Sequence, residues 1–171
     1  MKRLFFILTV SAIILTSCIR GQSPTTNLSL PLSFVANLKG SDGKFQVIVT
    51  ENECNIDFLE NHSLKGTRLH FNSDKGSATV GDFTREVDFA FFPAQKALIT
   101  AIRGLCDQTV NKTERDSQVL YTIDKMAIIV YYDEDKTTII GIETEEGKRR
   151  FEFDIAQLQA YEIQSDSAGQ S

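Results

Sequence analysis

The chain contains few of the residues from which metal and nucleophile sites are built. It has two histidines, His62 and His70, and three cysteines. Neither histidine has Cys or His neighbours at the spacing of a zinc site. A G-x-S-x-G elbow and a glycine-rich phosphate loop are both missing. The acidic residues 133–135 come without the glycine and the distal glutamate of a calcium loop. The sequence therefore predicts no metal, no cofactor and no enzyme activity.

Positive charge is also scarce. The chain has 18 lysines and arginines against 23 aspartates and glutamates, for a net charge of −5. Nucleic-acid binding draws most of its affinity from neutralising phosphates, so this balance predicts no nucleic-acid partner. It also argues against a polybasic patch that would hold the chain to an anionic membrane.

No apolar run is long enough to span a bilayer. The longest, from Leu4 to Leu15, falls short of the roughly 20 residues that a spanning helix needs. Lys2 and Arg3 precede it, and small residues follow it, which is the pattern of a secretory signal peptide. A buried core helix is disfavoured, because the run is apolar on all faces and precedes a polar segment.

The residues Leu15-Thr16-Ser17-Cys18 resemble the lipobox of bacterial lipoproteins. The resemblance implies a diacylglycerol on the Cys18 thiol and cleavage of residues 1–17 as a signal peptide. The mature protein would then be extracytoplasmic and held to the membrane by acyl chains. It would lie at the cell membrane of a Gram-positive host or, since Ile19 follows the cysteine, at the outer membrane of a Gram-negative one. An ordinary cleaved signal and an uncleaved anchor are the alternatives.

The rest of the chain divides into three parts. Residues 18–31 are polar, contain Pro24 and Pro31, and are expected to form a flexible tether after the lipidated cysteine. Residues 32–163 are expected to form a single β-rich domain. Residues 164–171 are expected to be a disordered tail.

Period-two hydrophobic patterns dominate the domain, and one helical pattern interrupts them. The helix is expected to begin at Pro93 and to end near Gly104. The predicted fold is mainly β (α+β): a strongly curved antiparallel meander of about ten strands with one helix on its concave face. Strands are expected at residues 32–38, 45–49, 54–58, 69–71, 78–80, 83–91, 120–123, 126–132, 139–142 and 151–155, with a short one within 158–163.

The order of these elements is similar to the half-barrel proteins of the LolA/LolB lipoprotein-carrier type, including uncharacterised Gram-positive lipoproteins of that fold. A tether precedes a meander, which continues through "ENHSLKGTRLHFNSDKGSATVGDFTREVDF" into a helix started by proline and a second meander. The resemblance implies a curved sheet that cups an apolar space. It carries over no functional residue, and this chain has one clear helix where those carriers have several.

Four phenylalanines on the strands before the helix are candidates for lining such a space: Phe58, Phe71, Phe89 and Phe91. The alternative is that they fill the core under the helix. Two cysteines, Cys54 and Cys106, remain outside the lipobox. They are interpreted as small buried apolar side chains, and a bridge between them is left open.

Two functions follow from these expectations. The first is a non-catalytic lipoprotein that binds a lipid or another apolar ligand. The alternative is a lipid-tethered module that binds a protein or cell-wall partner. It predicts a filled core and an exposed apolar patch, with Tyr131 and Tyr132 as first candidates for that patch.

Overall fold

A computed structural model describes residues 28–41, 43–59, 63–107, 111–115, 117–123, 126–135 and 137–162. Several expectations fall outside these ranges and stay predictions: the signal peptide, the lipidation of Cys18, most of the tether and the tail from residue 164. His62 also lies outside the described residues.

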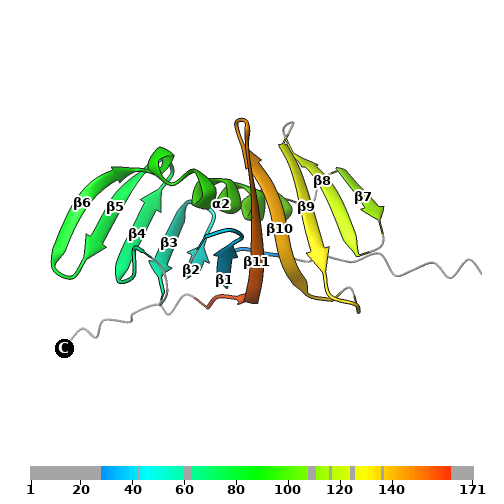
Figure 1. Cartoon of the computed structure of the whole chain (residues 1–171), viewed down its shortest axis with the longest axis horizontal. Helices are drawn as coiled ribbons and strands as arrows, with labels where there is room; N and C mark the ends of the chain where they lie inside the picture. Colours follow the sequence, from blue (N-terminus) through cyan, green and yellow to red (C-terminus); the bar gives the residue numbers. More distant parts are fainter. Residues whose placement is uncertain are drawn as a thin grey trace, which may run out of the picture.

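The described chain is mainly β. Eleven antiparallel strands form one curved, unclosed sheet with a single α-helix, an architecture compatible with a half-barrel (Figure 1). The strand order is β6-β5-β4-β3-β2-β1-β11-β10-β9-β8-β7, so each half of the sheet is a meander and the halves join where β1 pairs with β11. The elements are β1 (Leu32–Leu38), β2 (Lys44–Val49), β3 (Glu53–Phe58), β4 (Thr67–Asn72), β5 (Lys75–Val80), β6 (Phe83–Asp88), η1 (Phe89–Phe91), α2 (Pro93–Leu105), β7 (Asn111–Arg115), β8 (Gln118–Ile123), β9 (Met126–Tyr132), β10 (Ile139–Glu146) and β11 (Arg149–Ala160).

The expected strand over residues 83–91 was wrong at its end. β6 ends at Asp88, and a 3-10 turn, η1, takes up Phe89–Phe91. The Asp88 carboxylate accepts a hydrogen bond from the Ala90 backbone N–H at 2.8 Å. This cap satisfies a donor that the strand ladder no longer pairs, and it turns the chain toward the helix.

Two further differences lie in the second half. The polar segment after the helix contains β7, which its composition did not predict. The last expected strand and the short one after it form a single twelve-residue strand, β11.

The helix follows the expected pattern and covers one face of the sheet. It begins at Pro93 and ends at Leu105, and its spaced apolar residues are buried, Leu98 and Ile102 completely. The largest fully buried side chains come from this helix and from the helix-side face of the strands: Phe34, Phe45, Phe71, Phe153, Ile56, Leu69, Leu98, Ile99, Ile102, Ile128, Ile142 and Val47. The space between the helix and the middle of the sheet is therefore occupied by side chains.

The helix contacts both halves of the sheet. Near its start, Lys96 Nζ lies 3.3 Å from Asp74 Oδ1 in the β4–β5 turn. Near its end, Gly104 lies so close to Ile123 of β8 that a Cβ at position 104 would collide with it. Glycine, a poor helix former, therefore allows the helix to approach the Ile123 side chain closely at this position.

The described chain begins against the domain. Leu28 and Leu30 pack on the core, and the Tyr161 N–H donates to the Pro31 carbonyl at 3.0 Å. The start of the described chain is thus held beside the two central strands. Within the described residues, no helix has the length and apolar character needed to cross a membrane.

Candidate binding site

The four candidate phenylalanines differ in their exposure. Phe58, Phe71 and Phe89 are buried in the core, each at most 4% exposed. Phe91 is 79% exposed on η1. The four therefore do not line one common space: three contribute to packing, and one is available to a ligand.

Phe71 anchors the β4–β6 end of the sheet. Its ring stacks on Phe89 with centroids 4.0 Å apart, and Phe92 meets it edge-on at 6.0 Å. η1 thus covers this part of the sheet with aromatic side chains. Gly76, opposite Phe71 on β5, leaves no room for a Cβ.

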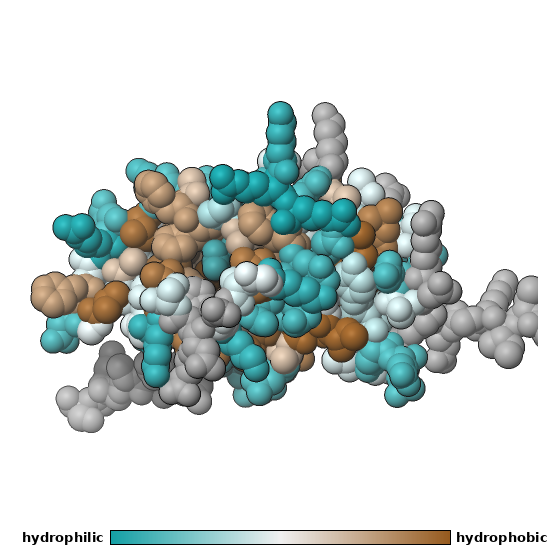
Figure 2. All heavy atoms as spheres, in the orientation of Figure 1, coloured by the Kyte–Doolittle hydropathy of each residue, from teal (hydrophilic) through white to brown (hydrophobic). Residues whose placement is uncertain are grey.

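Beyond this stack, the helix-side face of β5 and β6 is open. Val80 and Phe83 pair across the hairpin turn and are 52% and 83% exposed. We call Val80, Phe83 and Phe91 the apolar rim. Figure 2 shows apolar side chains gathered over the β4–β6 end of the molecule. Most large apolar side chains in the described residues are buried. The exposed apolar rim is therefore a candidate binding surface.

A pocket of about 590 Å³ opens at the Phe91 end of the rim, at the opposite end of the β5–β6 hairpin from Val80 and Phe83. Phe91 and Val87 give it apolar walls. It is lined by Asn72, Lys75, Gly76, Glu86, Val87, Asp88 and Phe91. This volume lies within the roughly 300–1,000 Å³ of small-molecule sites.

Arg85 supplies the rim with positive charge. It pairs with Ala78 across the hairpin, so it lies on the same face as Phe83 and Val87, between them on β6. It is exposed, and none of the ion pairs found among the described residues involves it. The rim thus combines apolar surface with an available guanidinium.

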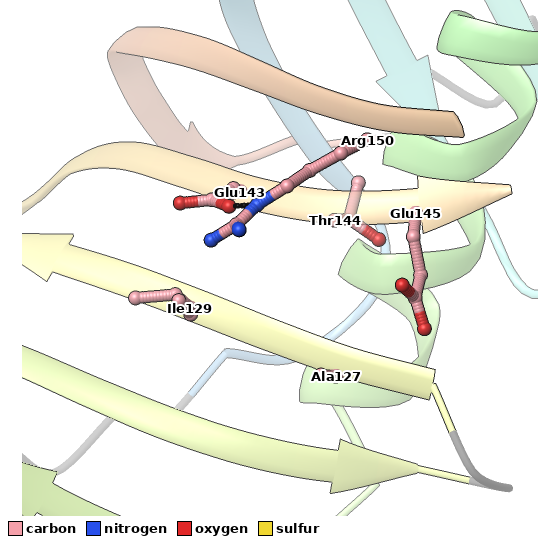
Figure 3. A pocket seen from close by; sticks show the side chains of 6 residues that line it. All are labelled: Ala127, Ile129, Glu143, Thr144, Glu145 and Arg150. Carbon is pink, nitrogen blue, oxygen red and sulfur yellow. Dashed lines mark ion pairs between the residues drawn. The ribbon is translucent and has the colours of Figure 1, made fainter. Parts of the chain in front are cut away.

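The opposite face of the sheet has a second, smaller pocket, shown in Figure 3. It measures about 170 Å³ and lies over β9 and β10. Arg150 reaches over β10 to form an ion pair with Oε1 of Glu143, and the Tyr131 hydroxyl donates to Glu143 Oε2 at 3.0 Å. Ile129 forms part of the floor.

The lining of this second pocket is organised around the structural ion pair of Arg150 and Glu143. Glu143 is buried, and a buried carboxylate needs the partners that it has here. The volume is below that of a drug-sized site. Tyr131 is therefore engaged and Tyr132 is buried, so neither forms the exposed patch for which the sequence suggested them.

Cys54 and Cys106 are free thiols in the structure, so the bridge that the sequence left open is not formed there. Cys54 is buried, as the interpretation as a small apolar side chain expects, and Cys106 is half-buried. Burial raises the pKa of each thiol to about 11. Both sulfurs are therefore protonated at neutral pH and poor nucleophiles.

The one described histidine is structural. His70 Nδ1 lies 2.8 Å from Asn55 Oδ1 on the neighbouring strand. Within the described ranges, no group of three or more His, Cys, Asp or Glu side chains is placed to hold a metal ion.

Sequence reasoning overlooked the rest of the rim. Val80, Phe83 and Arg85 alternate as in any half-buried strand, and the pattern alone does not show that β6 ends the sheet. The available signal was the position of this hairpin just before the helix, where the meander stops.

No family model and no curated protein matches this chain. Among solved structures, one titled "Crystal structure of LprF from Mycobacterium bovis" is similar over 76% of this chain and 86% of that chain. The two share 8% of residues at a TM-score of 0.35, so the likeness carries no argument about function.

Proposed function

We propose that this chain is an extracytoplasmic, LolA-like lipoprotein, anchored through acyl chains on Cys18, that binds an amphiphile without transforming it. The ligand carries an apolar chain and an anionic headgroup. It binds at the apolar rim rather than between helix and sheet. The observation that carries the proposal is that exposed Val80 and Phe83 share one face of the β5–β6 hairpin with Val87, which lines an open pocket together with Phe91.

The apolar rim supports the chain of the ligand. Covering apolar surface is worth about 25 cal/mol per Å², and aromatic side chains offer the largest areas. An acyl chain along Phe83, Val87 and Phe91 would cover the surface that the helix leaves open. The packed core explains why the site lies at the end of the sheet.

Arg85 supports the headgroup. A guanidinium presents two parallel N–H donors to a carboxylate or phosphate. Lying between Phe83 and Val87, Arg85 is placed to pair with an anion whose chain extends along the rim.

The test is binding of a dansyl-labelled undecanoic acid and of its methyl ester to the full chain, followed by dansyl fluorescence. We expect Phe83→Ser with Phe91→Ser to weaken both probes by about tenfold or more, because two large apolar side chains are lost from the rim. Arg85→Gln should weaken the acid and leave the ester unchanged.

The matched control is Ile140→Ser, which removes another exposed apolar side chain, 48% exposed on β10. It should bind both probes like the parent chain. Equal loss in the control, or unaltered binding in the Phe83→Ser Phe91→Ser variant, would show that the probes do not bind at the rim.

A protein partner is the second candidate for the same surface. The free edge of β6 runs directly beside the rim, so an extended partner strand could pair with β6 and cover Phe83. Absence of probe binding, together with a protein captured from the host envelope by the parent chain but not by the Phe83→Ser variant, would favour this candidate.

A further inference from the structure

The other end of the sheet also has a free edge. β7 comes last in the strand order, and among the described residues it pairs only with β8. An unpaired edge strand presents a row of backbone donors and acceptors to any strand that fits it.

The hairpin fixes which backbone groups of β7 point outward. Arg115 pairs with Gln118 across a two-residue connection, a geometry in which the closing pair exchanges both backbone hydrogen bonds. Bonding alternates along an antiparallel ladder, so Thr113 directs its backbone groups to β8. Lys112 and Glu114 direct theirs to the free edge.

The side chains at those two positions carry opposite charges. Lys112 and Glu114 pair with Tyr121 and Val119, so they share the helix-side face. Their charged atoms, Nζ and Oε1, lie 3.4 Å apart. A second β7 placed antiparallel by a two-fold axis at Thr113 would bring each Lys112 opposite the other copy's Glu114. Each of the four charges would then have an opposite charge beside it and another across from it.

Hydrogen bonding and charge therefore specify the same register. With the axis at Thr113, the two threonines form a non-hydrogen-bonded pair. The flanking pairs of Lys112 with Glu114 are the ones whose backbone groups face each other. Cross-strand Thr–Thr pairs and opposite-charge pairs both stabilise antiparallel sheets.

β6 shows that this match is not a property of every charged edge. Its outward backbone groups belong to Thr84, Glu86 and Asp88, because Val80 and Phe83 close the hairpin. A two-fold axis at Arg85 or at Glu86 sets that residue against its own copy. An axis at Thr84 opposes Asp82 with Glu86, and one at Val87 opposes Glu86 with Asp88. Each of these registers places like charges together.

From these two edges we infer that two copies of this chain pair through β7, antiparallel about Thr113, to form one continuous sheet. The occupant of the β7 edge is a second copy because the strand is complementary to itself in two respects. Its outward-pointing backbone groups face those of the copy, and its charges face opposite charges. The inference does not depend on the proposed ligand.

The pairing is expected to be weak in free solution. A five-residue strand gives an interface below the roughly 1,000 Å² of stable complexes. Holding two copies at one surface raises their effective concentration, up to the millimolar range for short linkers. The dimer should therefore form mainly where copies are crowded, as on a membrane.

A cysteine at position 113 traps the dimer. In a non-hydrogen-bonded pair the Cα atoms lie about 4.5 Å apart, within the range that a disulfide bridges. Thr113→Cys is introduced into the full chain, bacterial membranes containing it are oxidised with copper–phenanthroline, and the dimer is read on a non-reducing gel. The control is Thr84→Cys on the edge of β6. We expect the dimer from Thr113→Cys and only background from Thr84→Cys.

Charge exchange tests the register. In the Thr113→Cys chain, Lys112→Glu alone or Glu114→Lys alone should reduce the dimer by about fivefold to thirtyfold, because two attractive pairs become repulsive. Lys112→Glu combined with Glu114→Lys should restore it. A lesion that merely unfolds β7 would not be rescued by the second substitution.

Three results would overturn the inference. One is a Thr113→Cys chain whose introduced thiol reacts with maleimide yet yields no more dimer than Thr84→Cys. Another is equal dimer in the single and double charge variants. The third is loss of the dimer in both single variants without recovery in the double variant while circular dichroism shows the fold intact.

Discussion

The two ends of the sheet differ in what they expose. The β4–β6 end exposes Val80 and Phe83 and has an edge that opposes like charges when it meets its own copy. The β7–β8 end exposes a Lys112–Glu114 ion pair on an edge that complements itself. β6 and β7 are both edge strands of the same sheet, so their position alone does not explain the difference.

An open sheet has two unpaired edge strands, and each can pair with another chain in a different way. At one end, like charges disfavour self-pairing, and the exposed apolar surface there is the place where we propose that a ligand binds. At the other, charge selects an identical partner. Ligand binding and pairing would then occupy opposite ends and need not compete.

The largest effect should come from removing the aromatic anchor of one end. Phe71→Ala deletes the ring between Phe89 and Phe92, and it should lower the free energy of unfolding by about 3–5 kcal/mol in urea titrations. Hydrogen exchange should show lost protection in β5 and β6, with β7 and β8 unchanged. Equal loss at both ends would show that they are not independent.

A smaller effect is expected at the β10–β11 pair near the centre. Arg150→Ala leaves the buried Glu143 carboxylate with Tyr131 alone. Because Arg150 is itself largely exposed, we expect a loss of about 1–2 kcal/mol, below the cost for a fully buried pair. Chemical denaturation measures it.

The double variant Arg150→Ala Glu143→Leu is the control, since it removes the stranded charge. It should regain most of the lost stability. Failure to regain it would mean that Arg150 contributes through packing of its aliphatic part.

The two thiols should make the free energy of unfolding depend on pH. Their folded pKa of about 11 lies above the value of roughly 8.5 for an exposed thiol. The folded chain thus keeps protons that the unfolded chain loses. This contribution to stability is complete below about pH 8.5 and declines as the pH rises toward 11. For Cys54 the decline should reach about 1–3 kcal/mol, and Cys54→Ala should remove that part of the pH dependence.

The smallest effect should come from the apolar rim itself. Phe83→Ser removes an exposed ring, so the free energy of unfolding should change by less than about 0.5 kcal/mol. Thermal unfolding of the variant beside Phe71→Ala measures the contrast. A loss of several kcal/mol would mean that Phe83 is part of the core, and its place in a binding surface would be wrong.

Much of this fold could be predicted from alternation and helix periodicity. The strand at Cys54, Ile56 and Phe58 and the helix from Pro93 follow their patterns, because burial of one face determines both. β7 could not be found this way. It is polar along its length, and it forms a strand because its backbone pairs with that of β8.

The site was less predictable, and Phe91 shows why. Phe89 and Phe91 are two residues apart, as on one face of a strand, so both were predicted to line the same apolar space. The Asp88 cap ends the strand between Val87 and Phe89, and the resulting turn buries Phe89 while exposing Phe91. The turn that this hydrogen bond caps therefore determines which of the two phenylalanines is exposed.

The position of the first strand has a mechanical consequence. β1 lies in the middle of the sheet, paired on one side with β2 and on the other with β11. A force applied to the N-terminal side of Pro31 therefore loads both ladders in shear, so many hydrogen bonds must break together. An edge strand would instead peel away one bond at a time. Chain entry at the centre makes this domain resistant to being pulled from its N-terminus.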